Sequence, residues 1–207
     1  MGIKFEKVTH SFKNPDGKGC FIAMQDIDLN IDGKSEFVAV CGHTGSGKST
    51  LIQHMNALLF PTSGTLEIFD RVIKKKRNRK LNEIRKRVGL VFQFPEYQLF
   101  DETVLKDVMF GPINFGLKKE EAKEKAINAL KMVGFEENLY DQSPFKLSGG
   151  QMKKASIAGI LALEPDIIVL DEPTRGLDPQ SSLEVMELFD DIHKKYDKTI
   201  VVITHDM

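Results

Sequence analysis

Apolar runs of strand length recur along the chain, and most of them do not alternate with polar residues. Each run ends at a polar or glycine-rich corner, and the four runs cover residues 36–41, 88–92, 167–170 and 200–204. Strands that are apolar on both faces belong to a sheet covered on both sides, which is usually a parallel sheet with helical crossovers. Segments with helical periodicity separate the runs, and they cover residues 49–59, 118–133 and 181–196. The pattern therefore predicts an α/β fold with a mainly parallel sheet flanked by helices.

The first 35 residues follow a different pattern. Apolar and polar residues alternate over 3–12 and 27–31, and a turn signal, Asn14-Pro15-Asp16-Gly17, lies between them, which predicts an antiparallel β layer. Residues 94–147 differ again, because they are mostly helix and loop punctuated by prolines. We expect one domain over residues 1–207. Its predicted parts are an antiparallel β layer (1–35), a core (36–93 and 148–207) and an inserted helical subdomain (94–147).

Composition excludes several classes of protein. The chain has 207 residues, 41% of them hydrophobic, with dispersed charges of both signs, so it is neither disordered nor fibrous. Two cysteines are too few for a disulfide framework, and no Cys/His spacing indicates a zinc site, so we expect a reducing, cytoplasmic setting. No apolar run in the sequence is long enough to cross a bilayer.

The net charge of −1 hides an uneven distribution. Positions 71 to 87 hold ten Lys or Arg residues and one acid, Glu83, so the rest of the chain is acidic. One interpretation of this basic block is a solvated hairpin and helix face. Another is attraction to an anionic membrane surface. A nucleic-acid contact fits less well, because the block lacks interleaved aromatic residues and the chain as a whole is not basic.

The segment 42–49 has the composition of a phosphate-binding loop. It reads Gly42-His43-Thr44-Gly45-Ser46-Gly47-Lys48-Ser49, follows a predicted strand and opens a predicted helix, which Thr50 continues. Glycines let successive backbone N–H groups turn toward one anion, and the helix N-terminus adds partial positive charge. Lys48 is placed to reach the β and γ phosphates of a nucleotide, and Ser49 to ligate Mg²⁺.

Two carboxylates, Asp171 and Glu172, follow the predicted strand 167–170. A carboxylate beside a phosphate loop is explained by a metal ion between them, so we expect Asp171 to meet Mg²⁺ directly or through water. The adjacent Glu172 is then available as the general base that polarises the water attacking the γ-phosphate. Without the loop, the same pair is equally well interpreted as solvated acids at a strand end.

Two further polar residues end predicted strands, Gln93 after 88–92 and His205 after 200–204. In open parallel sheets, ligands bind beyond the carboxyl ends of the strands. We therefore expect the phosphate loop, Gln93, the acidic pair and His205 to meet at one edge of the sheet.

A second anion site is predicted before a helix rich in small and apolar residues. Its sequence is Leu147-Ser148-Gly149-Gly150-Gln151. A hydroxyl, unobstructed backbone N–H groups and a helix N-terminus all favour an anion there. One nucleotide cannot easily use two such loops of one chain, so we expect the corresponding loop of a second subunit to close over the nucleotide of this one.

In this order, the motifs resemble the nucleotide-binding domain of an ABC ATPase. Segment 42–49 is similar to Walker A, Gln93 to the Q-loop, 147–151 to the LSGGQ signature, 167–172 to Walker B, Gly176-Leu177-Asp178 to the D-loop and His205 to the switch histidine. The resemblance implies ATP with Mg²⁺, the metal being held by Ser49, Gln93 and Asp171. It also implies that Lys48, Gln93, Glu172 and His205 act in catalysis. By the same resemblance Phe12 stacks on adenine, although an aromatic residue on a small β layer equally often belongs to the core.

Within that family, residues 91–100 and 157–162 and the pair Glu164-Pro165 resemble the ATPases of energy-coupling factor (ECF) importers of vitamins, cobalt or nickel. The stretch around Pro95-Glu96-Tyr97 resembles the second of the two ATPase types of those systems. The resemblance implies head-to-tail pairing with a second ATPase subunit, either a paralogue or a second copy.

The same resemblance implies a membrane coupling subunit that docks near Gln93–Phe100 and a separate membrane subunit that binds the substrate, with no nucleic acid involved. The chain would then be a peripheral subunit at the cytoplasmic face of the cell membrane. The rival class is a soluble ABC ATPase that acts on nucleic acid or the ribosome. This chain lacks the long coiled-coil insertion and the second ATPase half that are typical of those proteins.

The resemblance also predicts more chain after the switch histidine. In the family further strands follow it, whereas Asp206 and Met207 follow His205 here. We therefore expect a shortened ATPase whose His205 is poorly anchored, because terminal residues fray.

Overall fold

The computed structural model of the chain describes residues 2–74 and 81–205. Its strands and longer helices are β1 (Ile3–Lys13), β2 (Cys20–Ile31), β3 (Phe37–Cys41), α1 (Lys48–Met55), β4 (Ser63–Ile68), β5 (Arg71–Val72), α2 (Leu81–Arg87), β6 (Val88–Val91), α3 (Val104–Asn114), α4 (Lys119–Met132), α5 (Gly149–Leu161), β7 (Ile167–Asp171), α6 (Pro179–Tyr196) and β8 (Thr199–Thr204). Short 3₁₀ helices are η1 (Pro95–Gln98), η2 (Glu137–Leu139) and η3 (Pro144–Lys146).

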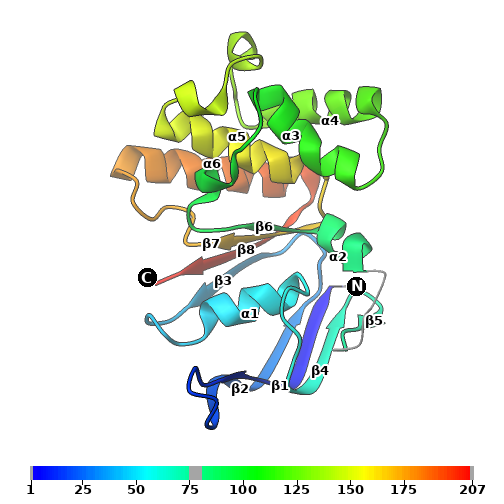
Figure 1. Ribbon diagram of the computed structural model, residues 1–207, viewed down its shortest axis with the longest axis vertical. Helices are drawn as coiled ribbons and strands as arrows, with labels where there is room; N and C mark the ends of the chain where they lie inside the picture. Colours follow the sequence, from blue (N-terminus) through cyan, green and yellow to red (C-terminus); the bar gives the residue numbers. More distant parts are fainter. Residues whose placement is uncertain (1, 75–80, 206–207) are drawn as a thin grey trace.

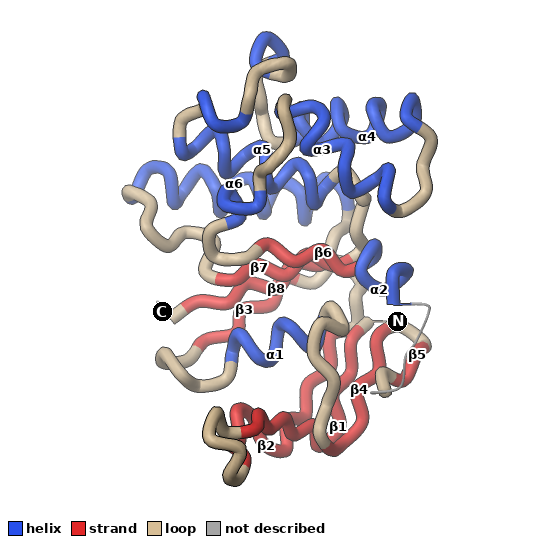
Figure 2. The backbone as a smooth tube through the Cα atoms, in the orientation of Figure 1, coloured by secondary structure: helices blue, strands red, loops and turns tan. Residues whose placement is uncertain are grey.

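These elements form stacked layers. Helices α3 to α6 lie above a parallel sheet, α1 lies below that sheet, and an antiparallel sheet lies below α1 (Figures 1 and 2). The predicted fold class, a mainly parallel sheet flanked by helices with an antiparallel layer near the N-terminus, is confirmed.

The four predicted apolar runs form the parallel sheet, in the order β3-β8-β7-β6. Alternate residues of its central strands enter two separate cores. The core shared with α3 to α6 takes Ile168, Leu170, Ile200 and Val202. The core shared with α1 and the antiparallel sheet takes Ile167, Val169, Val201 and Ile203. This two-sided burial explains why β7 and β8 do not alternate polar with apolar residues.

Strand β3 departs from the prediction that both faces of the run are covered. It lies at the edge of the parallel sheet and pairs with β8. Val38 and Val40 pack against the lower core, but Phe37 is 40% exposed and Cys41 is exposed. Helix α6 reaches only the start of this face, where the rings of Phe37 and His193 are 5.6 Å apart.

The antiparallel layer is larger than the predicted span 1–35. Its order is β2-β1-β4-β5, so residues 63–72 join it rather than the parallel sheet. Leu66 and Ile68 of β4 are fully buried there. The prediction missed this pairing because β4 is distant in sequence from β1, and alternation within the first 35 residues cannot reveal its partner.

The helical layer also crosses a predicted boundary. Helix α5, which we assigned to the core segment 148–207, packs against α3 and α4, and its Ala155 and Ala158 share a core with Leu130 of α4. We expected Pro112 to interrupt helical structure, but it lies buried inside α3 near the C-terminal end of that helix.

Three arginines in the described part of the basic block, residues 71–87, make contacts within the chain. Arg71 pairs with Glu83, and Arg85 donates to the Ala57 carbonyl at 3.2 Å. Arg87 pairs with Asp166 at 2.6 Å and stacks on the ring of Phe69. Residues 75–80, which carry half of the block's cations, lie outside the described residues. Three of the block's cations thus stabilise the fold through contacts within the chain. Across 2–74 and 81–205, no helix has the length and apolarity needed to span a membrane.

Candidate functional site

The phosphate-binding loop connects β3 to α1, as the sequence predicts. Gly45 and Gly47 adopt positive φ angles of 83° and 90°, which only glycine adopts without strain. Gly47 also lies against β2, where a Cβ atom would come closer than 3.0 Å to the Ala23 carbonyl oxygen. The backbone N–H of Ser46 donates to the His43 carbonyl at 3.2 Å and closes the turn.

Lys48 is held over this loop. Its Nζ donates to the carbonyls of Gly42 and His43 at 2.6 and 2.9 Å. The ammonium group therefore lies where the loop could present it to an anion, and these two carbonyls satisfy it without one. A phosphate oxygen is a stronger, charged acceptor and would compete with them.

A cavity of about 320 Å³ lies beside the loop and brings most of the predicted site residues together. Its lining residues are Phe12, Phe21, Ala23, Thr44, Gly45, Gly47, Lys48, Ser49, Thr50, Gln93, Asp171, Glu172 and Arg175. The predicted meeting of the loop, Gln93 and the acidic pair at one sheet edge is thus seen in the structure. Gly42, His43 and Ser46 shape the loop and do not line the cavity.

Glu172 occupies a strained position directly after β7. Its φ is +47°, in the left-handed region, and its N–H donates to the Ile203 carbonyl of β8 at 2.9 Å. Oε1 lies 3.0 Å from Nδ1 of His205, and Oε2 accepts from Nη1 of Arg175 at 2.8 Å. Burial alone would raise the pKa of this carboxyl, but the hydrogen bonds from Arg175 and His205 outweigh it and hold the pKa below its usual value.

His205 is thus placed in contact with the predicted general base. It does not line the cavity beside the phosphate loop but lines a second cavity with Glu172, Thr204 and the loop 174–177. Its Nδ1 has a defined partner in Glu172, and the expected weak anchoring of His205 stays a prediction.

Asp171 is half-buried at the end of β7 and faces Lys48. Burial raises the pKa of this carboxyl, the charge of Glu172 adds to the increase, and Lys48 and Arg175 partly offset it. A divalent cation at this point would stabilise the ionised form, and Ser49 and Gln93 line the same cavity. Across the described ranges, no cluster of three or more His, Cys, Asp or Glu side chains could hold a metal alone. Ser49, Gln93 and Asp171 each offer an oxygen atom, the donor type that Mg²⁺ prefers, so the chemistry of these residues fits that ion.

The predicted second anion site lies away from this cavity. Ser148 caps α5 by accepting from the Gln151 N–H at 3.3 Å, and the Gln151 side chain accepts from the Ser148 N–H at 2.9 Å. Gly149 and Gly150 are exposed, with open space where a side chain would lie. They line a separate groove with the loop 176–178. This subunit therefore presents the signature outward and does not place it on its own phosphate loop.

Sequence reasoning missed Arg175. This residue lines the cavity and contacts Glu172, and its guanidinium also lies beside Gln93. With the Gln93 amide oriented so that its oxygen faces the arginine, that oxygen accepts from Nε at 2.7 Å and from Nη1 at 2.9 Å. The available signal in the sequence was the position of this arginine, three residues after Glu172, the predicted general base.

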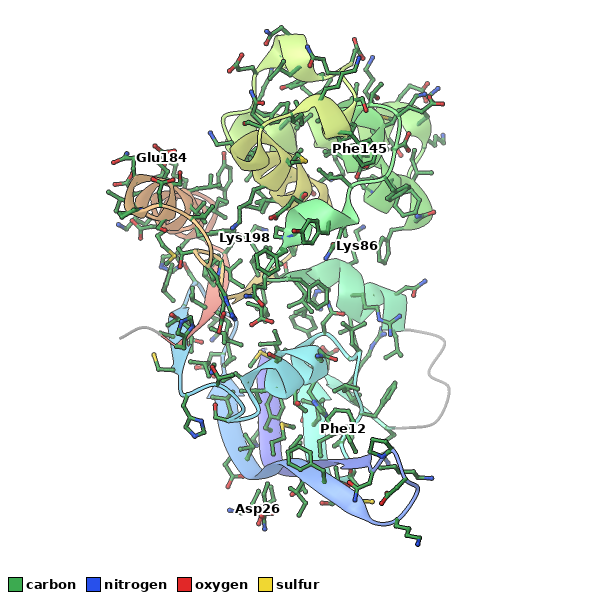
Figure 3. All side chains as sticks on the ribbon, turned by 60° about the vertical axis from the view of Figure 1, so that its left-hand side comes forward. Phe12, Asp26, Lys86, Phe145, Glu184 and Lys198 are labelled. Carbon is green, nitrogen blue, oxygen red and sulfur yellow. The ribbon has the colours of Figure 1, made fainter. Side chains whose placement is uncertain are left out.

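Phe12 lies at the cavity wall, together with an aromatic residue that we did not predict. It is 40% exposed and pairs across the β1–β2 hairpin with Phe21, which is 61% exposed. Figure 3 shows Phe12 on the hairpin below α1. The His10 ring supports Phe12 from behind, with ring centroids 4.5 Å apart. Two exposed rings beside a phosphate loop make a surface on which a nucleobase could stack.

Comparison with known proteins gives consistent matches. The family described as "ABC transporter" matches residues 24–175. The energy-coupling factor transporter ATP-binding protein EcfA2 of Lactococcus lactis subsp. lactis (strain IL1403) is 52% identical over 99% of this chain and 70% of its own length. The protein of the same name from Bacillus subtilis (strain 168) is 54% identical over 90% of this chain and 67% of its own length.

Solved structures agree with these relatives. The structure of cbiO1 from Clostridium perfringens, described as part of the ABC transporter complex cbiONQ, has a TM-score of 0.85 at 39% identity and covers 99% of this chain and 78% of that one. A dimeric post-hydrolysis state of the ATP-binding cassette MJ0796, bound to ADP and Pi, has a TM-score of 0.85 at 34% identity and covers 99% and 88%.

Proposed function

This chain belongs to the ABC transporter family, and we propose that it is the ATPase subunit that energises an importer of the energy-coupling factor type. The observation that carries the proposal is the meeting of the phosphate loop, Gln93 and the β7 carboxylates around one cavity. The relatives named above are transporter subunits, which favours an importer over an ATPase that acts on nucleic acid or the ribosome.

The phosphate loop would bind the triphosphate of ATP. Residues of the loop and the start of α1 line the cavity, where their N–H groups would bind phosphate oxygens, and Lys48 would exchange its bonds to loop carbonyls for bonds to the β and γ phosphates. Phe12, with Phe21 beside it, would stack on the adenine. Ser49, Gln93 and Asp171 would hold Mg²⁺, which neutralises phosphate charge when bound.

Glu172 would act as the general base of hydrolysis. It would take a proton from water as the water oxygen bonds to the γ-phosphorus and the bond to the ADP oxygen breaks. His205, 3.0 Å from Oε1, would orient this carboxylate. The lowered pKa of Glu172 keeps it ionised, so it can accept the proton at neutral pH.

A second ATPase subunit would complete the site. The signature loop is exposed, capped and remote from the nucleotide cavity of its own subunit, so its backbone donors are available to a nucleotide held by a partner. This supports head-to-tail pairing with a paralogue or a second copy.

A membrane coupling subunit would dock on an aromatic surface made of Phe94, Tyr97, Phe100 and Phe110. Tyr97 is 84% exposed, and the rings of Phe100 and Phe110 meet edge to face with centroids 4.7 Å apart. Exposed aromatic clusters of this kind are typical of protein interfaces. Because Phe94 follows Gln93, movement at this surface would reach the nucleotide cavity. A separate membrane subunit would select the vitamin or metal ion, and this chain would lie at the cytoplasmic face of the membrane.

Two substitutions test the proposed chemistry. Glu172→Gln preserves shape but removes the base, so ATP binding and ATP-driven pairing should persist while hydrolysis falls by about a hundredfold or more. Lys48→Ala should instead weaken binding of a fluorescent ATP analogue. Unchanged turnover of Glu172→Gln contradicts the general-base role, and unchanged affinity of Lys48→Ala contradicts the phosphate-loop assignment.

A further inference from the structure

Arg175 connects two parts of the site that lie far apart in the sequence. Its Nη1 donates to Glu172 Oε2 at 2.8 Å, and its Nε and Nη1 reach the Gln93 amide oxygen at 2.7 and 2.9 Å. The two loops also approach each other beside it, because a Cβ on Gly176 would lie 3.9 Å from the Phe94 ring. One guanidinium therefore ties the segment that follows β6 to the carboxylate that follows β7.

These bonds use the atoms that the proposed chemistry needs. Both carboxylate oxygens of Glu172 have partners, Oε1 with His205 and Oε2 with Arg175. The Gln93 oxygen that would ligate Mg²⁺ points at the same guanidinium. Two N–H donors already occupy the Gln93 oxygen, and the cation of Arg175 makes the Glu172 carboxylate a weaker base, so both groups act best once the guanidinium has left. The arginine contacts and the catalytic contacts are therefore alternatives.

We propose that Arg175 is a positioning residue that locks Gln93 to Glu172 in the nucleotide-free subunit, and that hydrolysis requires the guanidinium to release both. The inference rests on the roles proposed for these two residues. Two of the three side-chain hydrogen bonds of Arg175 go to Gln93, so withdrawal of Gln93 leaves that side chain, which is 53% exposed, with a single ion pair. The arginine half of this pair is in contact with solvent, where water can replace it, so movement of the Gln93 segment makes release of the base easier.

This lock consists of the hydrogen bonds from the Arg175 guanidinium to Gln93 and Glu172, and it depends on the planar fork of arginine. Nε and Nη1 together reach one oxygen of Gln93 while Nη1 also reaches Glu172. A lysine carries one compact charge and cannot reproduce this fork. Arg175→Lys should therefore keep the charge but lose most of the lock, and Arg175→Ala should lose both. Lys194→Ala is a matched control, because it removes an exposed cation paired with Asp190 on α6, far from the site.

The first experiment uses the nucleotide-free protein and measures hydrogen–deuterium exchange in residues 92–100. We expect exchange there to become about threefold to thirtyfold faster in Arg175→Ala, somewhat less so in Arg175→Lys, and unchanged in Lys194→Ala. Wild-type exchange in both arginine variants, with the fold intact by thermal melting, overturns the lock.

The second experiment measures steady-state ATP hydrolysis. Release of the base should raise the basal kcat of Arg175→Ala about threefold to tenfold, while KM for ATP changes by less than about twofold. A fall in kcat would make Arg175 a contributor to catalysis and overturn its role as a restraint. The double variant Arg175→Ala/Glu172→Gln separates the two claims. Hydrolysis by this variant at the rate of Arg175→Ala refutes Glu172 as the base. The hydrogen–deuterium exchange of residues 92–100 tests the lock independently of that assignment.

Discussion

Replacing Gly47 by alanine tests whether the close approach of the phosphate loop to β2 sets the shape of the nucleotide site. The φ of +90° costs an alanine about 1–2 kcal/mol. The added methyl group would also come closer than 3.0 Å to the Ala23 carbonyl oxygen, and such overpacking costs about 1–3 kcal/mol. Loss of chain entropy in the unfolded state returns about 0.4–1 kcal/mol. We therefore expect a loss of about 1–5 kcal/mol in the free energy of unfolding.

Gly134→Ala is the matched control. Gly134 also has a positive φ, +62°, but nothing lies within 4 Å of an added Cβ. It should lose only about 0–1 kcal/mol, because the steric term is missing. Urea unfolding measures both variants, and titration with a fluorescent ATP analogue should show weaker binding only for Gly47→Ala, whose loop must move away from β2. Equal losses in the two variants, with equal affinities, would refute this account of the loop.

Two further predictions concern other parts of the molecule. Burial lowers the pKa of His54 below the usual value for histidine, about 6.5, so the unfolded chain binds more protons than the folded one just below that pH. Stability should therefore fall as pH drops below about 6.5, by up to about 1.4 kcal/mol per pH unit. Urea unfolding at several pH values should show a shallower slope for His54→Gln than for the wild type, and identical slopes in the two proteins would disprove this. Phe100→Ser should weaken association with the membrane subunit about tenfold in a purified-component binding assay without slowing ATP hydrolysis by the isolated chain. Tyr196→Ser is the control, because Tyr196 is an exposed aromatic residue on α6, and this variant should bind normally. Equal binding by the two variants would place the docking surface elsewhere.

The chemical motifs could be predicted because each depends on a short stretch of sequence. The loop 42–49 specifies its own turn through its glycines, and Asp171 and Glu172 follow a strand whose uninterrupted apolar pattern marks it as central. Parallel strands that end at one edge then bring Gln93 and the acidic pair together, whatever the order of the strands.

The features that could not be predicted depend on contacts between distant segments. Strand β4 belongs to the antiparallel sheet because it pairs with β1, and α5 belongs with α3 and α4 because their apolar faces meet. Phe21 and Arg175 reach the cavity through the hairpin register and through a loop conformation. Sequence spacing gives no signal for Phe21, and the place of Arg175 three residues after Glu172 does not by itself show that its guanidinium turns toward the cavity. Strand β3 has a buried-strand sequence but an edge position, which depends on strand order alone.

The central claim is that this chain hydrolyses ATP, with Glu172 as the base, as part of a membrane transporter. The most direct measurement is phosphate release by the complex purified from native membranes through a tag on this chain. We predict that the wild-type complex contains an integral membrane subunit and releases phosphate from ATP, and that the Glu172→Gln complex retains the same subunit and bound ATP but releases about a hundredfold less. Phosphate release by the Glu172→Gln complex at the wild-type rate would contradict the claim.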